Sequence, residues 1–270
     1  MKHVYRYQDN VEYWNQRWVE AGADKDHFED LSIYPIRYAE MVMTDSSKCA
    51  LEIGCGLGRV LLHYQKQGFP VVGVERSEVA VAAIKERHPE ADVRLGDALS
   101  LPFRDSEFDV IMAFGVYHNL ERGIDKGLVE VARCLSPGGR FCISMRPDNI
   151  EMRLNEVYWQ WHNRKRRRGE KHFHKVLVGE GEFAAMLGRA GLETDSVHRA
   201  RNVSLLYRLP FLRSRSAARG DEAARRSMGY RLNAVGRLLD RALKASLPYH
   251  TANVLVFVGR KAEKGDGRSW

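Results

Sequence analysis

The stretch that most constrains the fold is a glycine-rich turn that follows a short apolar run. Residues 49–53 are apolar except for Glu52, and glycines then alternate with other residues at Gly54, Gly56 and Gly58. Glycine lacks a Cβ, so a turn built from it can bend tightly and approach a ligand closely. The residues that follow suit a helix, whose first turn offers unpaired N–H groups and the positive end of its dipole. The pattern predicts a buried strand, a ligand-binding turn and a helix.

The spacing of the glycines argues against a dinucleotide-binding turn. That turn has a third small residue at the sixth position of G-x-G-x-x-G, where this chain has Arg59. Glu52 would also repel a pyrophosphate, whereas it suits a ligand that carries positive charge. The pattern therefore favours a nucleotide-like ligand with a cationic group.

Two further acidic residues follow the next predicted strands. The strand predicted at 71–74 ends at Glu75, about twenty residues after the glycine turn, where a carboxylate can accept both ribose hydroxyls. The strand predicted at 92–95 leads into Asp97 and Ala98. Helices are predicted between these strands, so the segments alternate as in a parallel α/β sheet.

The later segments continue the same order. A strand is predicted at 108–114, a helix near 126–135 and a strand at 141–145, with Leu-Ser-Pro-Gly-Gly-Arg at 135–140 before the last. Taken together, residues 34 to 146 resemble the class I S-adenosylmethionine-dependent methyltransferases. The resemblance implies S-adenosylmethionine as cofactor, with its adenine bound by Asp97 and by the N–H of Ala98. The residues that it assigns to cofactor binding are Glu52, Gly54, Cys55, Gly56, Gly58, Glu75, Arg76, Asp97, Ala98, Phe114 and Gly115.

The loop after the fourth strand faces the methyl group in this family. Methyl transfer depends mainly on orientation, and it needs a general base only when the acceptor is weakly acidic. His118 titrates in the useful range and is the candidate base, with Tyr117 beside it; the alternative is a structural histidine or one that packs over the cofactor. His174 and other histidines of the distal half are expected at the surface.

Several reactions are disfavoured by what the loops lack. No Asn/Asp-Pro-Pro-Tyr motif follows the fourth strand, which argues against methylation of an adenine amino group. No cysteine stands where pyrimidine C5 methylation would need one. No acidic–Asn cluster suggests magnesium, so no metal is predicted.

Composition indicates a globular protein without a membrane span. The 270 residues are 44% hydrophobic and 29% charged, enough for one large core. The four cysteines lack metal-ligand spacing and are expected as free thiols in a reducing compartment. With no signal peptide and no long apolar run, the sequence predicts a cytoplasmic protein.

We expect a seven-stranded doubly wound Rossmann-like sheet decorated by two helical segments. The predicted parts are an N-terminal helical lid at 1–45, a methyltransferase core at 46–200, a helical substrate-cap insertion at 201–248, a last core strand at 249–262 and a disordered tail at 263–270.

Charge is divided unevenly along the chain. Residues 1–146 hold 18 Lys and Arg against 22 Asp and Glu, whereas residues 147–270 hold 25 against 13. The span 201–241 has ten arginines against three acidic residues and is interspersed with apolar residues, which favours an anionic or amphiphilic small-molecule acceptor. The basic run at 164–168 makes RNA the alternative acceptor. A non-catalytic cofactor-binding module and a dehydrogenase remain the alternatives of another class, and the oligomeric state is left open.

Overall fold

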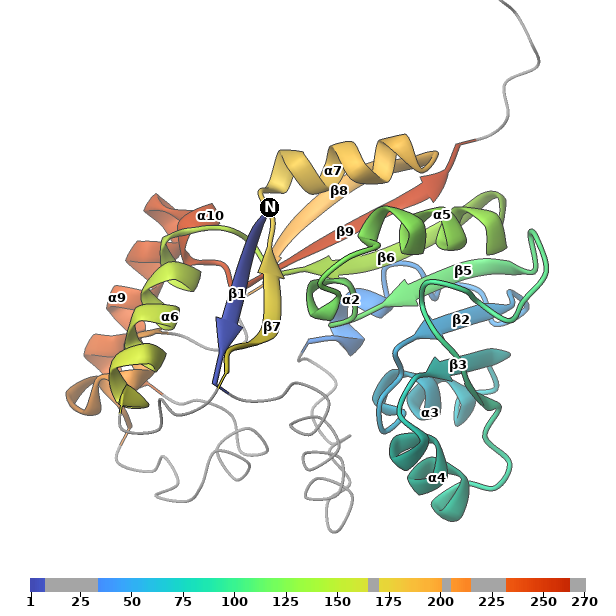
Figure 1. The fold of residues 1–270 in the computed structure, drawn as a ribbon, viewed down its shortest axis with the longest axis horizontal. Helices are drawn as coiled ribbons and strands as arrows, with labels where there is room; N and C mark the ends of the chain where they lie inside the picture. Colours follow the sequence, from blue (N-terminus) through green and yellow to red (C-terminus); the bar gives the residue numbers. More distant parts are fainter. Residues whose placement is uncertain (8–33, 165–169, 201–204, 215–231, 263–270) are drawn as a thin grey trace, which may run out of the picture.

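The computed structural model describes residues 1–7, 34–164, 170–200, 205–214 and 232–262. These residues form a seven-stranded sheet in the order β4-β3-β2-β5-β6-β9-β8 (Figure 1). The strands from β4 to β6 are parallel, and β9 runs antiparallel to both β6 and β8. Their bounds are Ala50–Ile53 (β2), Val71–Glu75 (β3), Val93–Leu95 (β4), Phe108–Ala113 (β5), Leu135–Met145 (β6), Leu192–Ala200 (β8) and Val254–Lys261 (β9).

Helices cover both faces of this sheet. Alternate strand residues therefore enter two separate cores: Leu51 and Ile53 pack on one side, and Ala50 on the other. The first face is covered by α5 (Ile124–Cys134) and α7 (Glu180–Arg189), and the second by α2 (Ile36–Ala39), α3 (Arg59–Gln65) and α4 (Glu78–Arg87). This two-sided burial explains why the strands read as apolar runs with few polar interruptions.

A second, two-stranded sheet lies beside the large one. It pairs β1 (Lys2–Arg6) with β7 (His172–Leu177) in antiparallel fashion, and Val4 lies opposite Lys175. The helices α6 (Ile150–His162), α9 (Ala234–Ser246) and α10 (Pro248–Thr251) gather beyond it, at one end of the molecule (Figure 1). Short 3₁₀ turns at Tyr117–Asn119 (η1), Leu205–Arg208 (η3) and Pro210–Leu212 (η4) complete the described elements.

The segments expected to decorate the core differ in part from prediction. Residues 2–6 of the expected helical lid form a strand, because the edge of β7 offers a partner far along the chain. At the end of the expected lid, where helix was predicted up to residue 45, the structure has only the four-residue α2, with turns after it. Most of the remainder of the lid, residues 201–204 and 215–231 of the predicted helical insertion, and the predicted disordered tail lie outside the described residues.

Two other boundaries have local causes. The Pro-Gly-Gly turn expected before strand 141–145 is a bulge within β6, since Phe108 pairs with Leu135 and Val110 already pairs with Arg140. The described part of the predicted helical insertion contains the helix α9. Among the described helices, none is long and apolar enough to cross a membrane.

Candidate active site

The glycine turn between β2 and α3 packs against the loop that follows β5. Gly54, Gly56 and Gly58 all have positive φ angles, of 68°, 56° and 79°. A Cβ on Gly54 would clash with Cγ2 of Val116, which belongs to the loop after β5. Two segments that the sequence placed in one site are therefore in direct contact, and this contact requires glycine at position 54.

Glu52 points away from the turn and into the helix layer. It shares a face of β2 with Ala50, and its Oε2 accepts a hydrogen bond from the N–H of Leu61, in the first turn of α3, at 2.8 Å. Only 3% of the residue is exposed, and this burial raises its pKa to about 8 despite the Leu61 N–H. Its position favours a role in fixing α3 to the strand over direct attraction of a cation.

Glu75 at the end of β3 is held in place by the backbone around it. Its Oε2 accepts from the N–H of Gly56 at 3.0 Å, and its Oε1 accepts from the N–H groups of Arg76 and Ser77, both at 2.9 Å. The carboxylate thus bridges the glycine turn and the start of α4. Three N–H donors leave one of its roughly four lone-pair sites for a ligand.

Asp97 lies at the corresponding end of β4. Its Oδ1 accepts from the N–H of Leu99 at 2.9 Å, and the described residues offer no donor to Oδ2. The preceding Gly96 lets this loop approach β3, since a Cβ there would lie 2.9 Å from Cγ2 of Val74. Ala98 is buried beside it.

The loop after β5 is fixed through a contact that the sequence did not indicate. The N–H of Gly115 donates to Oγ of Ser144 on β6 at 2.9 Å, and its carbonyl accepts from Nδ2 of Asn119 at 2.6 Å. The hydroxyl of Tyr34 donates to the same Ser144 Oγ at 2.7 Å, and the Tyr34 ring packs edge-on against Phe114. Burial raises the pKa of Tyr34 to about 12, so the hydroxyl keeps its proton as a donor.

The two candidate catalytic side chains have different surroundings. Tyr117 is fully buried in the α5 core, and its hydroxyl lies 3.4 Å from the carbonyl of Gly127. This placement favours packing of α5 over contact with a substrate. His118 is 8% exposed, and its Nδ1 is buried without a hydrogen-bond partner among the described residues.

Positive charge surrounds His118. Burial, followed by the charges of Arg146, Lys175 and His174, holds the pKa of His118 well below its usual range, so the imidazole is neutral at pH 7. His174, expected at the surface, is half-buried instead, and burial lowers its pKa to about 2. These neighbours come from β7 and from the end of β6; sequence reasoning missed them because basic residues are usually solvated.

The insertion's arginines are only partly available to a substrate. Arg213 donates to the carbonyls of Tyr207 and Arg208 at 2.6 and 3.3 Å. Arg237 donates to the carbonyl of Leu232 at 3.0 Å. Arg208 instead reaches α6, where its Nε donates to Oδ1 of Asn155 at 2.9 Å. Six of the ten arginines lie outside the described residues.

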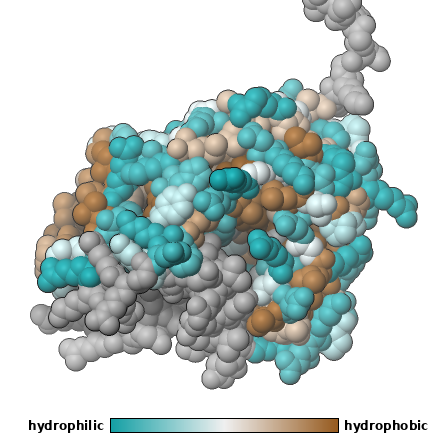
Figure 2. All heavy atoms as spheres, viewed as in Figure 1, coloured by the Kyte–Doolittle hydropathy of each residue, from teal (hydrophilic) through white to brown (hydrophobic). Residues whose placement is uncertain are grey.

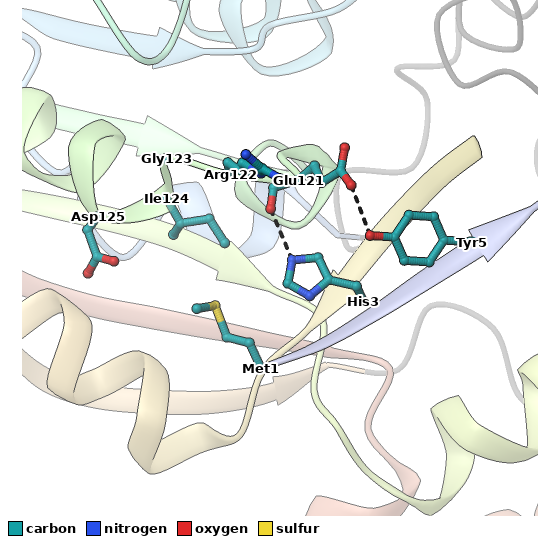
Figure 3. A pocket seen from close by; sticks show the side chains of 8 residues that line it. All are labelled: Met1, His3, Tyr5, Glu121, Arg122, Gly123, Ile124 and Asp125. Carbon is teal, nitrogen blue, oxygen red and sulfur yellow. Dashed lines mark hydrogen bonds between the residues drawn. The ribbon is translucent and has the colours of Figure 1, made fainter. Parts of the chain in front are cut away.

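A pocket of about 360 Å³ lies elsewhere, between β1 and the loop that enters α5 (Figure 3). Glu121 closes one side: its carbonyl accepts from Nε2 of His3 at 3.0 Å, and its Oε1 accepts from the Tyr5 hydroxyl at 2.9 Å. The pocket contains none of the predicted site residues; its lining is Met1, His3, Tyr5, Glu121, Arg122, Gly123, Ile124 and Asp125. We interpret this pocket as the space left where β1 packs against the loop before α5, and not as a substrate site.

The strand-end residues fit S-adenosylmethionine. The glycine turn keeps side chains away where the backbone must approach the ligand, Glu75 retains one acceptor site for a ribose hydroxyl, and Asp97 retains, for an amino group, an oxygen that no described residue uses. Cys55 is buried and packs on β3, since a Cβ added to Gly73 would lie only 2.9 Å from the Cys55 Sγ. The Arg76 side chain is exposed. Among the described residues there is no cluster of side chains suited to a metal.

Comparison with known proteins identifies the fold family. A methyltransferase-domain family model matches residues 51–143. A methyltransferase of Haloferax volcanii, solved in complex with the Trm112 methyltransferase activator, superposes with a TM-score of 0.61 at 17% identity, covering 96% of this chain and 98% of that one. Residues 51–143 thus match a methyltransferase domain, and the fold is that of a solved methyltransferase, in agreement with the resemblance that the motifs indicated.

Sequence relatives differ in what they methylate. A probable S-adenosylmethionine-dependent methyltransferase of Mycolicibacterium smegmatis is 30% identical over 60% of this chain and 58% of its own length. The mouse EEF1A lysine methyltransferase 4 is 29% identical over 63% of this chain and 75% of its own. A fatty-acid O-methyltransferase of M. smegmatis is 30% identical over 52% and 57%. The chain thus spans less than two thirds of the first relative, and these names do not agree on an acceptor.

Proposed function

We propose that this protein transfers a methyl group from S-adenosylmethionine to a small amphiphilic acceptor that carries an anionic group. The observation that supports cofactor binding most directly is the Glu75 carboxylate, which three backbone N–H groups hold at the glycine turn. A carboxylate fixed before the ligand arrives loses little side-chain entropy on binding. When bound, S-adenosylmethionine supplies a methyl group already activated by its sulfonium.

The loop after β5 is the proposed wall of the reaction site. Gly115 is hydrogen-bonded on both its N–H and its carbonyl, so the chain around it is held rigidly. His118, neutral at pH 7, accepts a hydrogen bond or a proton from the acceptor through its unpartnered Nδ1. Packing by Tyr34 and Phe114 keeps water from one side of this loop.

An anionic acceptor is supported by the positive charge around His118. Arg146 and Lys175 both lower the pKa of that histidine, so their charges lie close to it, whereas His174 is neutral at pH 7. One of the relatives is named a fatty-acid O-methyltransferase, and a fatty acid is an anionic amphiphile. RNA methylation stays the alternative: of the basic run at 164–168, the structure describes only Arg164.

Cofactor binding is tested by titration calorimetry of the full chain. The wild type should bind S-adenosylmethionine and should not bind NAD. Glu75→Ala should weaken binding at least tenfold, since each charge-assisted hydrogen bond contributes about 1.5–3 kcal/mol. Glu78→Ala is the matched control, because Glu78 is an exposed carboxylate three residues further on. Equal affinity of the Glu75 variant and the wild type would remove the assignment.

Methyl transfer itself is tested by formation of S-adenosylhomocysteine. The purified protein is incubated with cofactor and, in turn, with medium-chain carboxylic acids, the corresponding alcohols and amines, and RNA. We expect turnover with the acids above that with the amines. Turnover with RNA alone would replace the small-molecule acceptor by the alternative.

A further inference from the structure

The edge of β7 carries a lysine whose charge no neighbour neutralises. Lys175 is half-buried in the β1–β7 sheet opposite Val4. It shares a strand face with Leu177, which packs with Val4 and Met152, so this face is directed toward α6. The side-chain ammonium of Lys175 forms no hydrogen bond or ion pair with any described residue. A half-buried ammonium without a partner is costly to maintain.

The charges around Lys175 do not compensate it. Arg6, Arg146 and Arg208 lie close enough to lower its pKa, whereas Glu156 alone acts in the opposite direction. Glu156 is committed elsewhere, since Arg6 donates to both of its oxygens, at 2.6 and 3.3 Å.

A second polar group without a hydrogen-bond partner among the described residues lies in the loop after β5. The buried Nδ1 of His118 has no hydrogen-bond partner in the part of the chain that the structure describes, and the charges of both Arg146 and Lys175 lower the pKa of His118. Arg146 is anchored by a 2.7 Å hydrogen bond to the carbonyl of Asn253. Positive charge is therefore concentrated between η1, β7 and the end of β6.

We infer that Lys175, Arg146 and His118 form a binding site for an oxyanion, a carboxylate or phosphate, which is the head group of the methyl acceptor. This assignment rests on the proposed function and specifies the chemistry of the acceptor. An oxyanion provides the acceptor that the Lys175 ammonium lacks among the described residues, and a protonated oxygen or a water on it can donate to His118 Nδ1.

Aromatic rings beside the site suit the apolar part of such an acceptor. The Arg6 guanidinium lies 4.1 Å from the ring centre of Trp159, and that of Arg208 lies 4.5 Å from the ring of Tyr158. Both rings are half-buried on α6. The cations therefore adjoin an aromatic surface where an alkyl chain can pack.

The test uses calorimetric titration of the full chain with octanoate and octyl phosphate, and with octanol and octylamine as controls. Both anions should bind more tightly than octanol, and the comparison of the two tells carboxylate from phosphate. Lys175→Met keeps the length of the side chain and should weaken anion binding at least tenfold. Lys85→Met, an exposed lysine on α4, should leave it unchanged.

The pH dependence provides a second measurement. Burial, then the charges of Arg6 and Arg146, lowers the pKa of Lys175 to about 7, against the influence of Glu156; His174 and His118, the other titratable neighbours, are neutral at that pH. Octanoate affinity should therefore fall as pH rises from 6 to 8, and this fall should vanish in Lys175→Met.

Two outcomes would overturn the inference. One is octanol binding as tightly as octanoate; the other is equal octanoate affinity in Lys175→Met and the wild type. Binding of S-adenosylmethionine, measured on the same samples, separates this inference from the proposed function. A protein that binds the cofactor but no anion loses only the oxyanion site, whereas one that binds anions but no cofactor loses the proposed function.

Discussion

Replacing the buried Glu52 by glutamine should stabilise the protein, and increasingly so as pH rises. Burial raises the pKa of Glu52 from 4.5 to about 8. A carboxyl whose pKa is higher in the folded state binds its proton more tightly there, so its contribution to stability is complete below pH 4.5 and is lost as pH rises through 8. Glutamine stays neutral at every pH and can still accept from the Leu61 N–H.

The magnitude follows from the shift. The pKa of Glu52 in the unfolded chain is 4.5, and pH 7 is about 2.5 units higher. At roughly 1.4 kcal/mol per unit, keeping the folded carboxyl protonated at pH 7 lowers the stability of the wild type by about 3 kcal/mol relative to low pH. Burying the amide N–H groups of glutamine without partners costs about 1–2 kcal/mol in return. We expect Glu52→Gln to be more stable than the wild type by about 1–2 kcal/mol at pH 7.

Urea unfolding at pH 5, 6, 7 and 8 measures this difference. The amide cost does not depend on pH, so the gap between variant and wild type should grow by about 1.4 kcal/mol per pH unit up to about pH 7 and level off near 8. Glu86→Gln on the exposed face of α4 is the control and should show no such slope. A gap that is constant with pH, or that shrinks, would show that Glu52 is ionised in the folded state and would refute this account of its environment.

Two further substitutions test the loops. His118→Gln should keep cofactor affinity and thermal stability while losing about 10²–10⁴ in rate. Because the pKa of His118 is well below its usual range, the wild-type rate should not fall as the pH is lowered through 6.5. A drop in the wild-type rate centred near pH 6.5 would contradict this. Gly54→Ala should destabilise more than Gly68→Ala in thermal unfolding, since both glycines have positive φ but only Gly54 faces a neighbour, Val116. Equal losses of thermal stability in the two variants would mean that Val116 moves away from the added methyl group without destabilising the fold.

The part of the site at the strand ends could be predicted from the sequence because the patterns that mark it are local. A glycine turn, an acidic residue at each strand end and an apolar run can each be recognised within a few residues, and parallel strands bring those ends to one edge. The direction of Glu52 could also have been predicted. Residues two apart share a face of a strand, and Ala50 packs under α3.

The rest of the site depends on pairings between distant segments. Lys175 reaches the site because β7 pairs with β1, and no local pattern joins residue 4 to residue 175. Tyr34 contacts Ser144 on one face of the sheet although the two residues are 110 positions apart in the sequence. Tyr117 is buried because Gly127 leaves room for it; a Cβ there would lie 2.7 Å from its ring. A glycine inside an otherwise regular helix was the one available signal.

The order of strands arranges charge along the edge of the sheet. Asp97 follows β4, Glu75 is the last residue of β3, the neutral His118 follows β5, and Arg146 follows β6. A cationic methyl donor bound over the acidic end and an anionic acceptor held at the basic end would meet at the loop after β5. Transfer of a methyl group from a sulfonium to an oxyanion removes both charges, so cations that hold the reacting oxygen too tightly would slow the step. A lysine whose pKa is near 7 suits this requirement better than a third arginine, because it can release its proton once the negative charge is gone.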